Sequence, residues 1–223
     1  MRRAAFPAPL SAVGAASALA GLLLAVAPAR AAEDAGALLS RVEKTYRGSP
    51  SYSMTFVQSY APAGFPDAAP ETGELTLQAP ASLRFKYDGP EGKVYTFDGQ
   101  TARQYVAADK QLIVKRLTSS ERARLPLLFL QSPAEILARH TATVAEGPNG
   151  LTELTLVPKD GGEPKSVTAT VAATGEVKRL VVLDGEGNRT TFTFTALKPG
   201  KRRPASDFVL VPPAGTRTVS PEE

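Results

Sequence analysis

Few side chains in this chain of 223 residues could carry out catalysis or bind a metal ion. The sequence has no cysteine and one histidine, so it offers no thiolate nucleophile, no disulfide framework and no site built from several histidines. The histidine, His140, begins an expected strand with no identifiable nucleophile beside it, and we expect it to be solvated or hydrogen-bonded. Two pairs of nearby carboxylates are present, Glu71 with Glu74 and Asp184 with Glu186. They lie in expected turns and strand ends, where acids are common. Because no catalytic or nucleotide-binding motif is present either, we expect no enzyme, no metal site and no cofactor.

The N-terminus has the pattern of an export signal. Two arginines precede an apolar stretch over residues 10–27, and Ala29 with Ala31 supplies the small-x-small spacing that a signal peptidase needs. We therefore expect residues 1–31 to be a cleaved signal peptide and residues 32–223 to form a single domain. A retained membrane anchor is the alternative, which the Ala- and Gly-rich composition of the stretch disfavours.

The charge balance changes once this segment is set aside. The full chain has 26 basic and 22 acidic side chains, a net charge of +4, but the first 31 residues hold three arginines and no acid. The mature chain is then left with 23 basic and 22 acidic groups, so the composition gives little support for a nucleic-acid partner. An exported protein of this size without cysteine suits the bacterial periplasm.

Hydrophobic periodicity predicts one helix followed by many short strands. Apolar residues recur at helical spacing over residues 38–46, Asp34 is a suitable N-cap, and Gly48 is expected to end the helix in the left-handed conformation. From Tyr52 onward, apolar and polar residues mostly alternate, which is typical of strands. About ten or eleven short strands in meander order predict one large antiparallel sheet, strongly curved or partly closed.

Turn signals and one apolar insertion divide these strands. Asp98-Gly99, Asn149-Gly150 and the loop over residues 184–188 are each flanked by strand patterns and predict hairpins. Residues 119–139 are too apolar for a surface loop and contain two prolines, so we expect two or three short helices packed on the sheet. An apolar sheet face covered by helices gives either a filled core or a lidded cavity, and periodicity does not choose between them.

One stretch of the sequence resembles a known family. Residues 73–87, a glycine, a strand, Pro80 and a second strand, resemble the signature of the outer-membrane lipoprotein carrier proteins, the LolA family. Further segments follow in the order of that family: residues 97–99 with Tyr105, 109–111, 125–128, 154–159, 184–194 and 208–215.

The resemblance implies a fold and a function. The fold would be mainly β with an α lid, an open and incomplete antiparallel β-barrel covered by short helices. The protein would be a monomeric periplasmic chaperone that shields the acyl chains of lipoproteins. It would receive them from an inner-membrane releasing ABC transporter and pass them to an outer-membrane acceptor, LolB. Because that acceptor needs a lipid-attachment cysteine, the lack of cysteine favours the soluble carrier. No ion or coenzyme is implied.

Two sets of apolar residues would then form the binding site. The floor of the lipid-binding cavity would be lined by Leu75, Leu77, Leu83, Phe85 and Tyr87. The lid would present Leu38, Leu39, Leu127, Leu128, Phe129 and Leu130.

One position departs from the family pattern. The family usually carries an arginine immediately before the proline of its signature, where it tethers the lid, and here that position is Ala79. The lid could close by apolar contacts alone, Arg84 could replace the missing cation, or the cargo could differ. We favour the first, because Arg84 alternates out of phase with Leu83 and Phe85 and should point away from the cavity.

Four cations stand close together near the C-terminus: Lys198, Lys201, Arg202 and Arg203. This pattern is typical of a solvated loop, and the functional alternative is a surface that docks on an acidic transporter or on a membrane. Two other functions stay open for the whole chain: a carrier of another lipid or amphiphile, and a scaffold that binds proteins.

Overall fold

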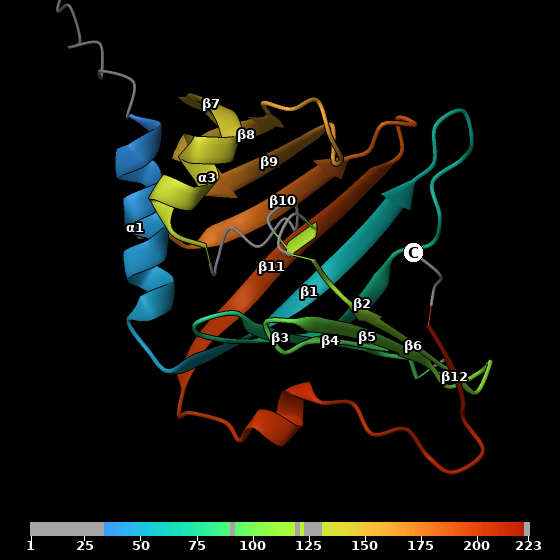
Figure 1. The fold of residues 1–223 in the computed structure, drawn as a ribbon. Helices are drawn as coiled ribbons and strands as arrows, with labels where there is room; N and C mark the ends of the chain where they lie inside the picture. Colours follow the sequence, from blue (N-terminus) through green and yellow to red (C-terminus); the bar gives the residue numbers. More distant parts are fainter. Residues whose placement is uncertain (1–33, 90–91, 119–120, 123–130, 221–223) are drawn as a thin grey trace, which may run out of the picture. The chain divides into compact units, whose positions relative to one another are not determined.

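The computed structural model describes residues 34–89, 92–118, 121–122 and 131–220 (Figure 1). These belong to one compact unit, Ala32–Glu223. The expected signal peptide over residues 1–31 lies outside the described residues, so its cleavage stays a prediction. Within the described residues, no helix has the length and apolar character needed to cross a membrane.

A twelve-stranded sheet dominates the described chain, in the order β12-β6-β5-β4-β3-β2-β1-β11-β10-β9-β8-β7. Neighbouring strands are antiparallel except for β12 and β6, which are parallel. The strands are β1 (Ser51–Ala61), β2 (Glu71–Gln78), β3 (Ser82–Tyr87), β4 (Val94–Phe97), β5 (Thr101–Val106), β6 (Gln111–Arg116), β7 (His140–Glu146), β8 (Thr152–Pro158), β9 (Ser166–Val171), β10 (Val177–Leu183), β11 (Arg189–Gly200) and β12 (Arg217–Val219).

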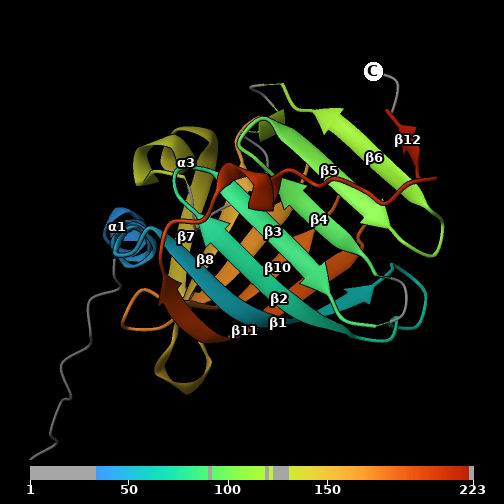
Figure 2. The same ribbon diagram turned by 90° about the horizontal axis from the view of Figure 1, so that it is seen from below.

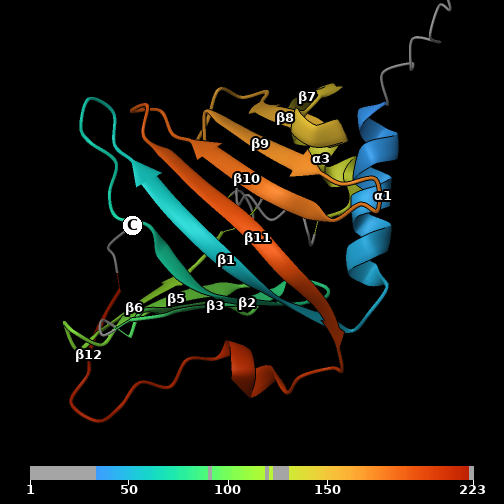
Figure 3. The same cartoon turned by 180° about the vertical axis from the view of Figure 1, so that it is seen from behind.

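Two meanders make up this sheet, and they meet at its two longest strands. The first runs from β1 to β6 and the second from β7 to β11, and β1 pairs with β11 along most of its length. Figures 1 and 3 show these two strands side by side, with β2–β6 turning away from the plane of β7–β11. The edge strands β7 and β12 do not pair with each other in the described chain, so the sheet stays open. The predicted mainly β, open antiparallel fold is confirmed.

The predicted hairpin turns are present. The Asp98 carboxylate accepts hydrogen bonds from the backbone N–H groups of Gln100 and Thr101, and Gly99 has a φ of 96°. Asn149 and Gly150, in the 3₁₀ turn η1 (Pro148–Gly150), have φ values of 56° and 72°. These left-handed conformations are tolerated by the residue types that mark hairpin turns in sequences.

Helix α1 (Ala35–Arg47) begins where the sequence predicts, with the Asp34 carboxylate accepting a hydrogen bond from the Gly36 N–H at 3.1 Å. The prediction for its end is wrong, because Gly48 has a right-handed conformation, with φ of −68° and ψ of −13°. Glycine instead avoids a tight contact there. A Cβ atom would lie 3.2 Å from the Tyr52 hydroxyl, which donates a 2.6 Å hydrogen bond to the Thr45 carbonyl.

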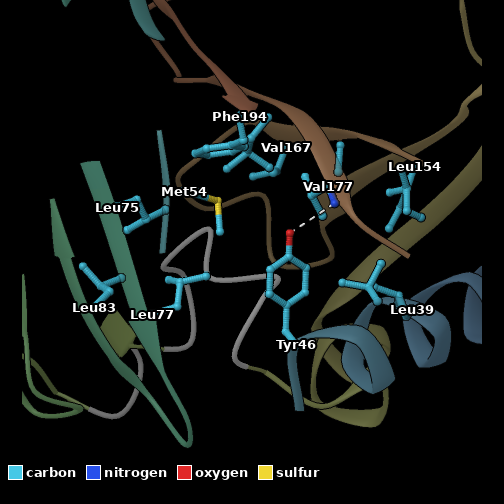
Figure 4. Close-up of a cluster of buried hydrophobic side chains, with 14 of the residues drawn as sticks. Leu39, Tyr46, Met54, Leu75, Leu77, Leu83, Leu154, Val167, Val177 and Phe194 are labelled. Atoms are coloured by element: carbon cyan, nitrogen blue, oxygen red, sulfur yellow. Dashed lines mark hydrogen bonds between the residues drawn. The ribbon is translucent and has the colours of Figure 1, made fainter. Parts of the chain in front are cut away.

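The buried side of α1 packs on the sheet through Leu38, Leu39, Val42 and Tyr46. At its C-terminal end, the Tyr46 hydroxyl accepts a 3.2 Å hydrogen bond from the Val177 N–H at the start of β10 (Figure 4). Burial raises the pKa of Tyr46 above its usual value, so the hydroxyl is neutral at physiological pH. The contact joins helix and sheet inside the apolar core.

Replacing Tyr46 with phenylalanine tests this contact. The variant keeps the ring but leaves the buried Val177 N–H without this partner, which is expected to lower the free energy of unfolding by about 1–3 kcal/mol. Urea denaturation measures the change. The matched control Tyr60→Phe, at an exposed position, should change stability by less than about 0.5 kcal/mol. Equal effects of the two substitutions would contradict the assigned role of Tyr46.

One helix of the predicted insertion is described. Helix α3 (Pro133–Arg139) begins with a capping box, in which Ser132 and Glu135 bond to each other's backbone N–H groups. Its Ile136 side chain is buried in the same core as α1. Residues 123–130, where further helix was expected, lie outside the described residues.

After β11, the chain crosses β2–β6 on the face of the sheet that points away from the apolar core, and it then forms β12 beside β6 (Figure 2). We call residues 201–216 the strap. It contains the short 3₁₀ helix η2 (Ala205–Phe208), whose Phe208 side chain is buried. Arg84, which points away from the apolar face as predicted, donates a 3.3 Å hydrogen bond to the Asp207 carbonyl. Arg84 therefore holds the strap.

Candidate ligand-binding face

One face of the sheet is apolar across nearly all of its strands, and we call it the inner face. In the first meander, Met54, Leu75 and Phe85 lie opposite one another in register across β1, β2 and β3. In the second, Leu154 pairs with Ala169, which pairs with Leu180. Both rows belong to one hydrophobic core. Helices α1 and α3 pack against this core through Leu38, Leu39 and Ile136.

The five predicted floor residues all lie on this inner face, but they differ in burial. Leu75, Leu77 and Leu83 are 0%, 2% and 5% exposed and form part of the packed core, on the side facing Leu39 and Leu154 in Figure 4. Phe85 and Tyr87 are only half-buried. Within the floor, the rings are therefore the side chains that are able to contact a ligand without unpacking the core.

Of the predicted lid residues, Leu38 and Leu39 are buried against the sheet. Leu127, Leu128, Phe129 and Leu130 lie outside the described residues. Whether any of these side chains covers a ligand stays a prediction.

Aromatic rings gather where the two meanders meet. Phe56 of β1 lies at the centre, with ring centroids 5.3 Å from Phe85, 5.0 Å from Tyr87 and 6.0 Å from Phe192. Phe192 stacks in turn on Phe194 at 6.0 Å. We call these five rings the aromatic cluster. Phe56 and Phe194 are buried, whereas the other three are half-buried, so the cluster has a packed base and a partly open surface.

Gly73 makes the central ring position possible. It pairs with Phe56 across β1 and β2, and a Cβ atom there would lie 2.7 Å from the ring and 2.2 Å from the Lys86 carbonyl oxygen. Such contacts are far inside van der Waals distance. The glycine of the family-like run is thus explained by the close approach of Phe56 to the strand.

A polar border limits the aromatic cluster. The Tyr87 hydroxyl donates to the side-chain carbonyl of Gln58, and the Lys93 ammonium lies 4.1 Å from the Tyr87 ring centroid and 2.6 Å from a Glu71 carboxylate oxygen. Burial, followed by the Glu71 charge, raises the pKa of Tyr87 above its usual value. The apolar face thus ends in paired polar groups.

Of the side chains that could have suggested catalysis, Glu71, Asp184 and His140 have structural partners. Glu71 pairs with Lys93, and the Asp184 carboxylate accepts hydrogen bonds from Asn188 in the β10–β11 turn. The His140 Nδ1 lies 3.0 Å from the Ile136 carbonyl oxygen, which fits the expected hydrogen-bonded histidine. Across the residues that the structure describes, no three His, Cys, Asp or Glu side chains are grouped so as to hold a metal ion.

The predicted cation loop lies apart from the inner face. Lys201, Arg202 and Arg203 line a pocket of about 360 Å³ between the beginning of the strap and the first residues of β1. Lys198 lies in strand β11 and not in a loop, so the expected loop holds only the other three cations. Lys198 pairs in register with Ser53, which also lines this pocket.

Arg84→Ala tests whether this arginine holds the strap or a lid. Because its guanidinium bonds to Asp207, the variant is expected to speed hydrogen exchange in residues 205–219 while changing affinity for an apolar ligand by less than about twofold. Exchange mass spectrometry and a ligand titration measure both properties. Arg179→Ala, at an exposed position on β10, is the control and should change neither. A loss of apolar-ligand binding in Arg84→Ala would give Arg84 the role of the missing family arginine.

Sequence comparisons extend over most of the chain. The model of the family described as outer membrane lipoprotein carrier protein LolA matches residues 47–210. An outer-membrane lipoprotein carrier protein of Pseudomonas syringae pv. syringae is 24% identical over 199 residues, which cover 89% of this chain and 94% of that protein. One of Ralstonia nicotianae is 26% identical over 154 residues, 68% of this chain and 70% of that protein.

A solved structure gives the same fold. An uncharacterised conserved protein of Thermus thermophilus superposes with a TM-score of 0.51 at 14% identity, covering 82% of this chain and 96% of that one. This similarity concerns the fold alone. The family match, however, includes every described strand from β1 to β11 and spans well over half of the sequence. The chain belongs to the outer membrane lipoprotein carrier protein family, LolA.

Proposed function

We propose that this protein is a periplasmic carrier whose inner face shields the acyl chains of lipoproteins. It receives them from an inner-membrane releasing ABC transporter and delivers them to an outer-membrane acceptor. The observation that carries the proposal is the aromatic cluster, three of whose rings are half-buried on an apolar face that continues into the core. Phe85, Tyr87 and Phe192 are the side chains we assign to contact the acyl chains.

The size of the hydrophobic effect explains why such a carrier is needed. Burial of each methylene is worth about 0.8 kcal/mol, so one sixteen-carbon chain in water costs on the order of 10 kcal/mol. A lipoprotein with several such chains does not cross an aqueous compartment unaided. A protein surface that covers the acyl chains removes most of this free-energy cost and makes the crossing possible.

Delivery limits how tightly the carrier binds. Without an energy source at the outer membrane, the acceptor has to bind the cargo more strongly than the carrier does. Half-buried rings that present apolar area without enclosing a fixed shape suit this requirement, because they accept chains of several lengths with moderate affinity. The polar border at Glu71 and Lys93 sets one limit to the apolar area.

The relatives and the N-terminus support the location and the cargo. The relatives above are outer-membrane lipoprotein carriers by name, and a cleaved signal over residues 1–31 would place this chain in the periplasm as well. The family is one of carriers and not of enzymes, in agreement with the sequence analysis.

Titration of the purified protein with an environment-sensitive apolar dye tests the proposal. We expect saturable binding, with the dye displaced by a long-chain fatty acid. The absence of any saturable site would contradict the carrier function and favour the protein-binding scaffold. Mass spectrometry of the material that co-purifies from the periplasm then separates lipoprotein cargo from another amphiphile.

A further inference from the structure

The pocket beside the strap has a rigid frame. The Ser49 and Ser51 hydroxyls donate to the carbonyls of Gly200 and Lys201, at 2.9 and 2.7 Å. The Gln78 side-chain amide bonds to both backbone groups of Arg203, accepting from its N–H at 2.7 Å and donating to its carbonyl at 3.2 Å. Because Ser51 and Gln78 are buried, these bonds fix the backbone of the strap while the cationic side chains stay exposed.

Glycine allows the strap to pass this closely over β1. A Cβ atom on Gly200 would lie 2.8 Å from the Ser51 hydroxyl oxygen, so a larger residue would force either that hydroxyl or the chain to shift. On its other side, the pocket is bounded by Asp207, whose carbonyl accepts the hydrogen bond from Arg84. Both walls are therefore tied to the sheet.

The charges around this pocket are unbalanced. Lys201, Arg202 and Arg203 line it, and the one acidic side chain in the lining is Asp207, which lies 3.4 Å from an Arg203 guanidinium nitrogen. Within the described chain, Lys201 and Arg202 form no ion pair. Three positive groups against one carboxylate leave an excess of two charges, carried by side chains whose backbone the hydrogen bonds above hold in place. An anion would relieve this repulsion.

We propose that this pocket binds a phosphate-bearing polar group. A phosphate monoester carries a charge of about −1.5 to −2 at neutral pH, which matches the excess of two better than a single carboxylate does. Guanidinium groups also pair with phosphate oxygens through two parallel hydrogen bonds. The volume of about 360 Å³ exceeds that of phosphate alone and leaves room for a small esterified group, either free in solution or as the phosphate monoester headgroup of a phospholipid.

Calorimetric titration with glycerol 1-phosphate, inorganic phosphate and succinate tests the site, beside co-sedimentation with vesicles that contain phosphatidic acid, a phosphate monoester, and with pure phosphatidylcholine vesicles. The variant Lys201→Gln with Arg202→Gln is expected to weaken phosphate binding about tenfold or more, since it removes two charged hydrogen-bond donors. The control, Lys165→Gln with Arg179→Gln, makes the same change of charge at exposed positions outside the pocket lining and should alter affinity less than twofold.

The outcomes separate the sources of the ligand. Saturable binding of glycerol 1-phosphate supports the site with a soluble ester as ligand, and binding to phosphatidic acid vesicles alone supports it with a lipid headgroup. The proposal is overturned by no binding in any arm, by equal losses in the two double variants, or by succinate binding as tightly as glycerol 1-phosphate. The last result would show that the pocket does not distinguish phosphate from carboxylate groups. Binding of the apolar dye is measured separately, so neither result depends on the other.

Discussion

Phe85→Glu is expected to weaken binding of an acyl chain at least about a hundredfold. Phe85 belongs to the half-buried part of the aromatic cluster. Its ring centroid lies 5.3 Å from that of Phe56 and 5.5 Å from that of Phe192. A bound chain would cover the new carboxylate, and burying an unpaired charge among apolar groups costs several kcal/mol. The measurement is a titration with a fluorescent fatty acid, after circular dichroism has shown that the variant is folded.

The matched control for this variant is Val57→Glu. Val57 lies on β1 next to Phe56 but points to the opposite face and is 42% exposed. The same charge placed there should leave affinity within about twofold of the wild-type value, because it stays in water. If both glutamates weakened binding equally, the inner face would not be the ligand site.

Leu75→Ala is expected to lower the free energy of unfolding by about 2–5 kcal/mol, the range for truncating a fully buried leucine. Leu75 is 0% exposed and lies between Met54 and Phe85 in the register of the sheet. Because Leu75 is fully buried and has no surface that a ligand could cover, its truncation should change ligand affinity by less than about threefold while the protein stays folded. Urea denaturation and the fatty-acid titration measure the two quantities.

Phe85→Ala should show the opposite pattern, with a smaller loss of stability and a larger loss of ligand affinity than Leu75→Ala. The Phe85 ring is already half-exposed, so truncation removes less packing than at Leu75 but takes away apolar area that the ligand would cover. We expect a loss of about tenfold in affinity, which corresponds to roughly 1.4 kcal/mol. This is only part of the free energy gained when a phenylalanine side chain is fully buried. A larger loss of affinity in Leu75→Ala than in Phe85→Ala would move the binding site away from the aromatic cluster.

The sequence predicted the sheet well because its signals are local. Alternation with period two and dipeptides such as Asp98-Gly99 act over a few residues, and the structure confirms both. β12 was missed, since Arg217–Val219 is too short to alternate and pairs in parallel with β6, far along the chain. Gly48 was misread because a glycine after a helix serves either a left-handed turn or a close contact, and its sequence position does not tell them apart.

The candidate site could be predicted only in part, for a related reason. Phe85 and Tyr87 stand out in the family-like run, but Phe56 and Phe192 join them only because β1 pairs with β2 and with β11. The pairing of β1 with β11 joins segments far apart in the sequence, so no pattern within either strand predicts it. Alternation also placed Leu75 and Phe85 on one face without separating the buried leucine from the half-exposed ring. The burial of a side chain depends on the neighbouring strands and helices. It is burial that distinguishes the residues of the packed core from those able to contact a ligand.

Photo-crosslinking in living cells tests whether the inner face contacts acylated lipoproteins. A photoreactive amino acid at position 85 lies on the inner face, and the same amino acid at position 57 lies on the opposite one. After irradiation, mass spectrometry identifies what each position has captured. We expect acylated lipoproteins attached at position 85 and few or none at position 57. Equal capture at both positions, or capture at position 85 of proteins that carry no acyl chain, would contradict this expectation.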